Sequence, residues 1–250
     1  MFKNTENFNS ASTIPKKAML PIYKDFYGQY VILKKLDLEE LDLLYEKTHG
    51  SDELITVWQY LPYGPFNSPE EMKQFYANYL TSSTKLVFCV HSAKTQEPIG
   101  ITCLEDINPD MGTIEVASVL YCKSVQKTEA NTETVYLLMK HCIQELGYRR
   151  IAWRCNSNNE ASKRSALRLG FEFEGIFYNH MIVKNGNRDT AWFGLIDQRW
   201  PPVSKNLETW LYHSKPEHRG SLFQLNTMVK GYSNVIMKDK SDSLSNVLTH

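Results

Sequence analysis

The chain of 250 residues is 42% hydrophobic and 22% charged, which is typical of a globular protein with one or two domains. Its 28 basic and 28 acidic residues give a formal net charge of zero. It therefore lacks the basic excess of a protein that binds nucleic-acid phosphates, and the charge bias of one held at a membrane surface. No apolar run approaches the ~18 residues of a membrane span. We expect neither a nucleic-acid partner nor membrane association.

The N-terminus has no apolar segment of the kind that a secretory signal requires. The segment 1–17 is rich in Ser, Thr and Asn, and we expect a flexible arm over residues 1–25. The five cysteines are odd in number and show no C-x-x-C spacing. This pattern favours buried thiols in a reducing compartment over disulfides or a metal site. We expect a cytoplasmic protein, with a nuclear location also open.

In the first half of the chain, a β-rich run at 30–33 predicts a strand. Helices are expected after Asp37, which has Glu40 at capping-box spacing, and after Ser68, which precedes Pro69 and a buried stripe of helical period. The segment 58–66 between them contains two prolines, a glycine and four aromatic residues, and is expected to be a loop. Three strands with short separators follow, which predicts antiparallel hairpins at 86–91, 98–104 and 113–121.

Helical periodicity returns at 132–146 and ends at Gly147, and a short strand and a second helix are expected at 151–155 and 159–169. Strands 113–121 and 151–155 are joined by this helical crossover, so they should be parallel neighbours. The last two strands, 173–183 and 189–196, flank Asn185-Gly186, a strong hairpin signal. The order predicts a mixed α/β domain over residues 26–202. The C-terminal extension, 203–250, should contain a short helix at 206–212 and then an irregular tail.

The most informative stretch is 125–133, where a strand ends and the crossover helix begins. The first backbone N–H groups of that helix lack intrahelical partners, and the helix dipole adds partial positive charge. A phosphate or pyrophosphate is the natural ligand for such a junction, although most junctions of this kind bind nothing. A second feature is the run from Asn159 to Ser162, continued by 168–175; Asn159 as a plain helix cap is the alternative role.

Together these features resemble the GCN5-related N-acetyltransferase (GNAT) superfamily, and more closely its branch that includes the ribosomal-protein N-terminal acetyltransferases. The resemblance covers about residues 26–202. It is carried by the loop that contains Gln126 and by the segments 27–31, 146–150, 159–171, 174–175, 187–193 and 200–201. It implies a mostly antiparallel central sheet with one splayed parallel pair and helices on both faces. It also implies transfer of an acetyl group from acetyl-CoA to a primary amine, of a small molecule or a protein N-terminus, by direct attack in a ternary complex.

The resemblance also implies where acetyl-CoA binds. Strand 113–121 would hold the pantetheine arm, a backbone N–H near Leu120 would stabilise the oxyanion, and Asn159 would hydrogen-bond the arm. The pyrophosphate would contact the loop residues Gln126, Lys127, Thr128, Glu129, Ala130 and Asn131. Basic side chains that could reach the phosphates are Lys127, Lys163, Arg164 and Arg168, each with a solvated surface position as the alternative.

This loop departs from the family pattern, which has glycine or alanine where Glu129 and Asn131 stand. Glycine lets the backbone approach a phosphate, whereas a carboxylate repels it. We therefore expect either a variant loop with Glu129 turned outward or weak binding of CoA.

The catalytic candidates are Glu115 and Ser162. Glu115 interrupts an apolar run, and could accept the proton of the amine directly or through water; a solvent-facing position is the alternative. Ser162 could donate to the leaving CoA sulfur, because Ala166 stands where many superfamily members have a tyrosine; a contact in the first helical turn is its alternative.

The acceptor pocket should form between the loop 58–66 and the final hairpin. Aromatic side chains would line it, since they offer large contact area and a cation–π surface to an amine. The candidates are Trp58, Tyr60, Tyr63 and Phe66, with Tyr178 and His180 opposite. Two other functions stay open: a CoA-binding or interaction module without turnover, favoured by the missing glycines, and a fold that binds no CoA. The sequence indicates neither the acceptor nor the oligomeric state.

Overall fold

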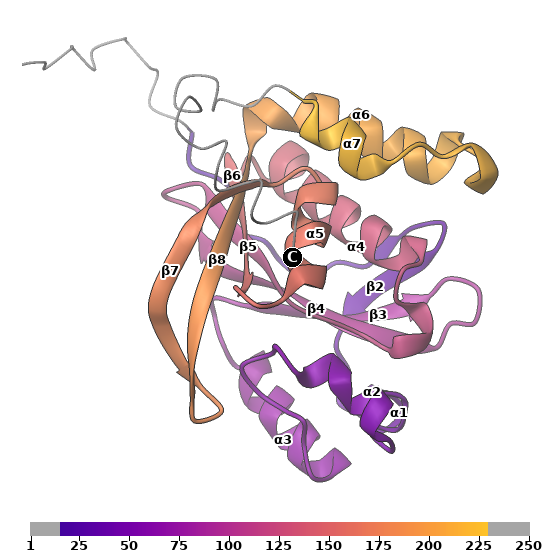
Figure 1. The fold of residues 1–250 in the computed structure, drawn as a ribbon, viewed down its shortest axis with the longest axis vertical. Coiled ribbons are helices and arrows are strands. Elements are labelled where there is room, and N and C mark those ends of the chain that lie inside the picture. Colours follow the sequence, from indigo (N-terminus) through magenta and orange to yellow (C-terminus); the bar gives the residue numbers. More distant parts are fainter. Residues whose placement is uncertain (1–15, 230–250) are drawn as a thin grey trace, which may run out of the picture.

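The structure, a computed structural model, describes residues 16–229. An eight-stranded sheet forms its centre, in the order β1-β2-β3-β4-β5-β6-β8-β7 (Figure 1). The strands are β1 Phe26–Tyr27, β2 Val31–Lys35, β3 Leu86–Ser92, β4 Pro98–Asn108, β5 Thr113–Tyr121, β6 Arg150–Asn156, β7 Glu172–Val183 and β8 Gly186–Ile196. Every neighbouring pair is antiparallel except β5 and β6, which are parallel. The expected fold class is confirmed.

Helices cover both faces of this sheet (Figure 1). They are α1 Glu40–Thr48, α2 Asp52–Ile55, α3 Pro69–Leu80, α4 Glu129–Lys140, α5 Glu160–Arg168, α6 Trp200–Glu208 and α7 Leu222–Thr227. One apolar core joins α1 and α3 to β3 and β4, and a second joins α4 and α6 to the sheet. Ser68 caps α3 by accepting a hydrogen bond from the Glu71 N–H, as its sequence predicts.

The limits of α4 and of the final hairpin differ from those predicted by the sequence. Helix α4 starts at Glu129, earlier than the period predicts, and a π-helical turn extends it to Glu145 before Gly147 at φ +78°. In the final hairpin, the two turn residues, Lys184 and Asn185, both have positive φ. The strand residues on either side of them, Val183 and Gly186, pair with each other. The turn is therefore centred one residue earlier than Asn185-Gly186, and β8 starts at Gly186 rather than Asp189.

The described parts of the two flanking segments, residues 16–25 and 203–229, pack against the domain. Residues 16–25 run along the domain, where the Ala18 and Met19 N–H groups donate to the carbonyls of Pro109 and Leu146. In the C-terminal extension, α6 already begins at Trp200, and α7 packs against α5 and α6 within the segment expected to be irregular. Residues 1–15 and 230–250, which belong to the expected arm and tail, lie outside the described part of the chain.

A buried carboxylate on α4 fixes the entry into the domain. Glu133 is 0% exposed and accepts hydrogen bonds from the backbone N–H groups of Gln29, Tyr30 and Val31, at 2.7, 2.6 and 2.8 Å. Gly28 passes so close that a Cβ there would lie 2.4 Å from the Glu133 carboxyl carbon. The glycine of the 27–31 segment is therefore required by packing. Over residues 16–229, no helix is both long and apolar enough to cross a membrane.

Candidate active site

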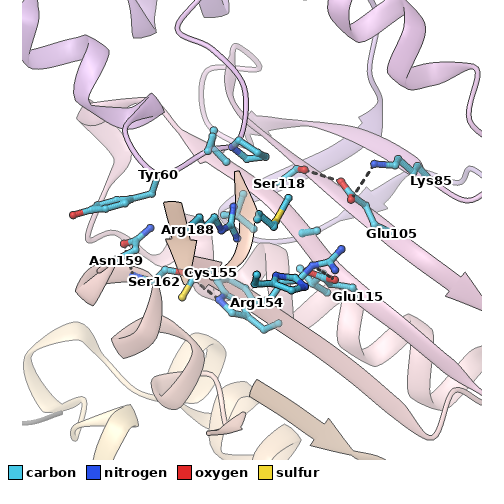
Figure 2. Close-up of a pocket in the computed structure, with 18 of the residues that line it drawn as sticks. Tyr60, Lys85, Glu105, Glu115, Ser118, Arg154, Cys155, Asn159, Ser162 and Arg188 are labelled. Atoms are coloured by element: carbon cyan, nitrogen blue, oxygen red, sulfur yellow. Dashed lines mark hydrogen bonds and ion pairs between the residues drawn. The ribbon is translucent and has the colours of Figure 1, made fainter. Parts of the chain in front are cut away.

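The site forms where β5 and β6 separate. Their pairing joins Thr113–Glu115 to Arg150–Ala152 and no further residues. Beyond it, a cavity of about 470 Å³ opens between β5 residues 116–119, the β6 residues 153–155, and the segments 57–62 and 180–188 (Figure 2). A left-handed Ser118, at φ +53°, accompanies a register shift between β4 and β5 at this point. Such a bulge bends the strand and helps it diverge from its neighbour.

Glu115 lies at the last paired position of β5 and is 1% exposed. It lines the cavity, with Arg154 Nε 2.8 Å from its Oε2. Burial raises the pKa of Glu115 to about 8, although the Arg154 guanidinium lowers it; the nearby Asp106 and Glu105 raise it further. A carboxyl whose pKa lies this close to neutrality can both accept and release a proton at physiological pH. The alternative of a solvent-facing Glu115 is wrong.

Ser162 and Asn159 lie on the opposite wall of the cavity. Asn159 caps α5, because its Oδ1 accepts a hydrogen bond from the Ser162 N–H at 3.0 Å. The Ser162 hydroxyl accepts the indole N–H of Trp153 at 3.0 Å, which leaves its own proton free to donate. The thiol of Cys155 also borders the cavity, and burial raises its pKa.

A second carboxylate in the cavity was not among the sequence candidates. Glu105 accepts a hydrogen bond from Ser118 Oγ at 2.7 Å and lies 3.1 Å from Lys85 Nζ (Figure 2). It also accepts a hydrogen bond from Tyr79 Oη at 3.1 Å. The network fixes the bulged residue of β5 to α3 and β3. Both carboxylate oxygens of Glu105 accept hydrogen bonds, whereas Oε2 of Glu115 has its ion pair with Arg154 but no hydrogen-bond partner within residues 16–229.

The expected aromatic pocket is only partly present. Tyr60 and His180 line the cavity, and His180 Nδ1 lies 3.0 Å from the Thr190 hydroxyl. Trp58, Tyr63 and Phe66 instead pack together in the core between the sheet and α1 and α3, where Trp58 is 0% exposed. Tyr178 is 74% exposed on the outer hairpin and does not line the cavity. The aromatic rings of Trp58, Tyr63 and Phe66 lie in the core because burial of their apolar surface is favourable.

The loop before α4 has the geometry of an anion site. Lys127 adopts φ +63°, and Thr128 caps the helix by accepting the Ala130 N–H at 3.3 Å. Within residues 16–229, the Lys127 and Thr128 N–H groups have no backbone partner. Gln126 Nε2 donates to the Tyr121 carbonyl, whereas the Asn131 Oδ1 is buried without a partner. The Leu120 side chain lies in the core, so only its backbone can act as the expected donor.

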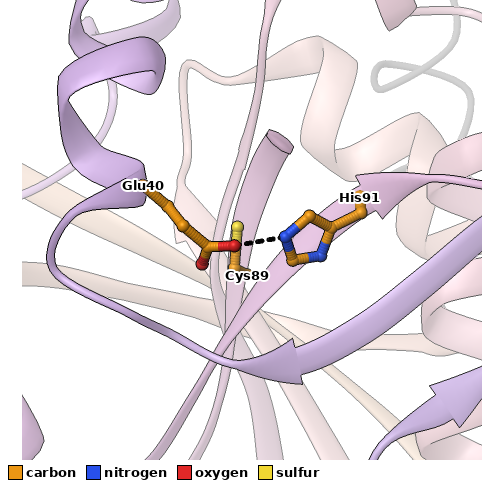
Figure 3. Close-up of side chains that lie close together, drawn as sticks. All are labelled: Glu40, Cys89 and His91. Carbon is orange, nitrogen blue, oxygen red and sulfur yellow. Dashed lines mark hydrogen bonds and ion pairs between the residues drawn. The ribbon is translucent and has the colours of Figure 1, made fainter. Parts of the chain in front are cut away.

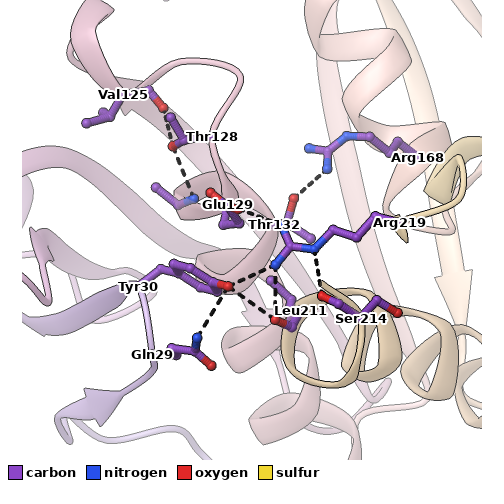
Figure 4. A network of polar contacts seen from close by, with 11 residues as sticks. Gln29, Tyr30, Val125, Thr128, Glu129, Thr132, Arg168, Leu211, Ser214 and Arg219 are labelled. Atoms are coloured by element: carbon purple, nitrogen blue, oxygen red, sulfur yellow. Dashed lines mark hydrogen bonds and ion pairs between the residues drawn. The ribbon is translucent and has the colours of Figure 1, made fainter. Parts of the chain in front are cut away.

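Glu129 is turned away from this loop by an arginine of the C-terminal extension. Its carboxylate forms an ion pair with Arg219 Nη1, and Arg219 also donates to the Tyr30 hydroxyl at 2.9 Å (Figure 4). The Arg219 guanidinium stacks over Trp210, 4.5 Å from the ring centroid. Although burial acts to raise it, these contacts hold the pKa of Glu129 below its usual value. The negative charge of Glu129, which would repel a pyrophosphate, is therefore neutralised by Arg219.

The basic candidates for CoA phosphates differ in their surroundings. Lys163 is buried and pairs with Glu160, and Arg168 donates to the Thr132 hydroxyl. Arg164 and Lys127 are exposed and free of ion pairs in the described chain. The last two can reach a phosphate without breaking an existing contact.

Among residues 16–229, one group of potential metal ligands lies away from the cavity, between α1 and β3: Glu40, Cys89 and His91 (Figure 3). The Glu40 carboxylate is already used, because Oε1 is hydrogen-bonded to His91 Nε2 and Oε2 accepts the Asp37 N–H at 3.2 Å. Burial raises the pKa of the Cys89 thiol well above its usual value, and Glu40 raises it further. We interpret the group as a polar contact that attaches α1 to the sheet.

Taken together, the described residues fit acetyl-CoA. An unpaired strand edge lies beside a cavity, a helix N-terminus has free N–H donors, and the one acidic group of the loop is neutralised. The residues that would hold the pantetheine arm lie at 116–120 and at Asn159, and those for the pyrophosphate at 126–131.

Comparisons with known proteins place the chain in a family. Residues 31–172 match the family model described as an acetyltransferase (GNAT) domain. A GCN5-related N-acetyltransferase from Brucella melitensis is 31% identical, with a TM-score of 0.79 over 85% of this chain and 98% of that one. A candidate GNAT-family acetyltransferase from Chromobacterium violaceum ATCC 12472 is 30% identical, with a TM-score of 0.70 over 80% and 98%. The chain therefore belongs to the GNAT acetyltransferase family.

A candidate ribosomal-protein-serine acetyltransferase from Vibrio cholerae shares the fold, with 19% identity and a TM-score of 0.59 over 69% of this chain and 97% of that one. A search of curated proteins finds no match.

Four charged residues of the cavity wall were not predicted from the sequence: Lys85, Glu105, Arg154 and Arg188. Two of them carried a usable signal. Glu105 follows directly on an apolar strand run, and Arg154 alternates with buried residues along β6. Arg188 was hidden because β8 begins earlier than the Asn-Gly turn predicts.

Proposed function

We propose that the protein transfers the acetyl group of acetyl-CoA to a primary amine, of a small molecule or a protein N-terminus, in a ternary complex. Bound acetyl-CoA supplies an acetyl group activated as a thioester. The observation that carries the proposal is the position of Glu115: a buried carboxyl of raised pKa in a cavity whose opposite wall holds Ser162.

An amine attacks a carbonyl only as the free base, so a nearby group must accept its proton. Glu115 is suited to this role because its pKa, raised to about 8, makes its carboxylate a stronger base than that of an ordinary glutamate. The Arg154 guanidinium lies 2.8 Å from this carboxylate. The free backbone edge of β5 would donate to the negative charge that develops on the carbonyl oxygen.

Ser162 would donate its hydroxyl proton toward the sulfur of the leaving group, since its acceptor side is already occupied by Trp153. A thiol leaves as a thiolate of pKa ~8.5, so one hydrogen bond is adequate help. Cys155 supports direct attack by the amine. Its raised pKa keeps the thiol protonated, and a protonated thiol is a poor nucleophile for an acyl-enzyme route.

The test combines binding and turnover. Acetyl-CoA should raise the unfolding temperature of the protein, and a panel of primary amines should be acetylated with release of free CoA thiol. Glu115→Gln should keep the binding and lower turnover by at least ~10²-fold. Binding without turnover on any amine would support the interaction-module function instead, and absence of binding at millimolar acetyl-CoA would contradict both.

A further inference from the structure

One charged side chain in the cavity forms no ion pair within the described part of the chain. Arg188 lies on β8 opposite Met181 of β7, borders the cavity and is 6% exposed (Figure 2). Within residues 16–229 its guanidinium forms no ion pair with a carboxylate, and its Nε is buried without a hydrogen-bond partner. Its donors are aimed at a space that a ligand could fill.

The other charges of the cavity wall are matched in pairs. Lys85 lies 3.1 Å from Glu105, and Arg154 lies 2.8 Å from Glu115 and 2.7 Å from Asp106. These pairs leave Arg188 as the unmatched charge. Burial lowers the pKa of Arg188, but an arginine stays protonated near neutral pH because its usual pKa exceeds 12. Among the residues that line the cavity, three are cationic (Lys85, Arg154 and Arg188) and two are anionic when Glu115 is ionised (Glu105 and Glu115). The lining therefore carries an excess of one positive charge, since Asp106 contacts Arg154 from outside it.

A buried cation without a partner is unfavourable, and a bound anion would compensate it. The planar guanidinium matches a carboxylate, which it can bind through two parallel hydrogen bonds. A carboxylate also carries the single negative charge that balances Arg188, whereas a phosphate monoester dianion would leave an excess. The cavity volume of about 470 Å³ is in the range of small-molecule sites.

We infer that Arg188 binds a carboxylate of the acceptor, so that the acceptor is a small amino-carboxylic acid whose amine faces Glu115. The inference rests on the proposed N-acetyltransferase function and narrows its substrate class. Polyamines and other purely cationic amines would be poor acceptors, because they would bring further positive charge to Arg188.

The test uses matched pairs of amines, each an amino acid and its carboxamide, at fixed saturating acetyl-CoA. For the wild-type protein we expect kcat/KM to favour the acid by about 10- to 100-fold, mainly through KM. In Arg188→Gln the preference should vanish, because kcat/KM for the acid should fall to the value that the same variant shows for the carboxamide. Arg188→Lys should keep part of the preference, and Lys205→Gln, at an exposed position of α6, should change nothing.

Three results would overturn the inference while the proposed function stands. The first is equal acetylation of acids and carboxamides by the wild-type protein. The second is an equal loss of kcat for both in Arg188→Gln, which would place Arg188 at the transferred acetyl group. The third is acetylation of peptides with an acidic first residue, but not of free amino acids, which would reject a small acceptor. If no amine at all is acetylated, the proposed function fails first. The wild-type comparison needs no variant, so it holds even if Arg188→Gln does not fold.

Discussion

Arg219 and Glu129 lie 90 residues apart in the chain and form an ion pair at the first residue of α4. The contact places the C-terminal extension directly behind the loop that is expected to bind the CoA pyrophosphate. It also explains how a glutamate can stand where the family has a small residue. The negative charge is present, but an almost buried guanidinium neutralises it.

We expect Arg219→Gln to weaken acetyl-CoA binding about tenfold, equivalent to ~1.4 kcal/mol, because Glu129 would then repel the pyrophosphate. Isothermal titration calorimetry measures this directly. Glu129→Gln should bind at least as well as the wild type, and the double variant should recover most of the loss. Unchanged affinity in Arg219→Gln would mean that the ion pair serves only the packing of the extension.

The rate of acetylation should depend on pH through Glu115. Below its pKa the carboxyl is protonated and cannot accept the amine proton, so kcat/KM should rise with pH and reach half its maximum near pH 8. The profile is measured with a weakly basic acceptor amine, because such an amine is already unprotonated near pH 8 and does not itself titrate there. Glu115→Gln should lose this limb of the profile, and an unchanged profile in that variant would remove Glu115 from the mechanism.

Arg154 affects the pH at which Glu115 titrates. Its guanidinium lowers the pKa of Glu115, so Arg154→Gln should move the rising limb to higher pH, and Arg154→Lys should move it less. The measurement is the same pH–rate profile. A uniform loss of rate at every pH, without a shift of the limb, would show that Arg154 acts on substrate binding instead.

Ser162→Ala should lower kcat by about 10- to 100-fold with little change in affinity for acetyl-CoA, since the lost hydrogen bond matters most when the sulfur becomes negative. Trp153→Phe removes the indole N–H that orients the hydroxyl, and should have a smaller effect. Steady-state kinetics of both variants with two different amine acceptors measure these effects. An intact kcat in Ser162→Ala would assign Ser162 to the first turn of α5 alone.

Glu133 carries a prediction about stability rather than catalysis. In Glu133→Gln an NH₂ group would face backbone N–H donors of residues 29–31, so the free energy of unfolding should fall by about 3 kcal/mol. Urea denaturation measures this change. Glu217→Gln, at an exposed position of the extension, is the matched control and should leave stability unchanged within ~0.5 kcal/mol.

The sequence was most informative where local rules decide structure. Ser68, Gly147 and the hydrophobic periods predicted helix limits and strands, and the crossover between 113–121 and 151–155 predicted the parallel pair. The position and partners of a residue could not be predicted in this way where contacts between distant parts of the chain determine them. The partner of Glu129 is Arg219, in a segment without hydrophobic period, and Trp58 became a core residue because α1 and α3 enclose its loop. Arg188 enters the cavity only through its pairing with β7.

The three-residue pairing of β5 and β6 also has a mechanical meaning. It divides the sheet into two leaves, β1–β5 and β6–β8, joined along a short seam at Thr113–Glu115 and Arg150–Ala152. A change in the angle between the leaves would alter the separation of Ser118 from Ser162 far more than the position of Glu115, which lies on the seam itself. The cavity can then adjust its width to an arriving substrate while Glu115, the proposed proton acceptor, keeps its position.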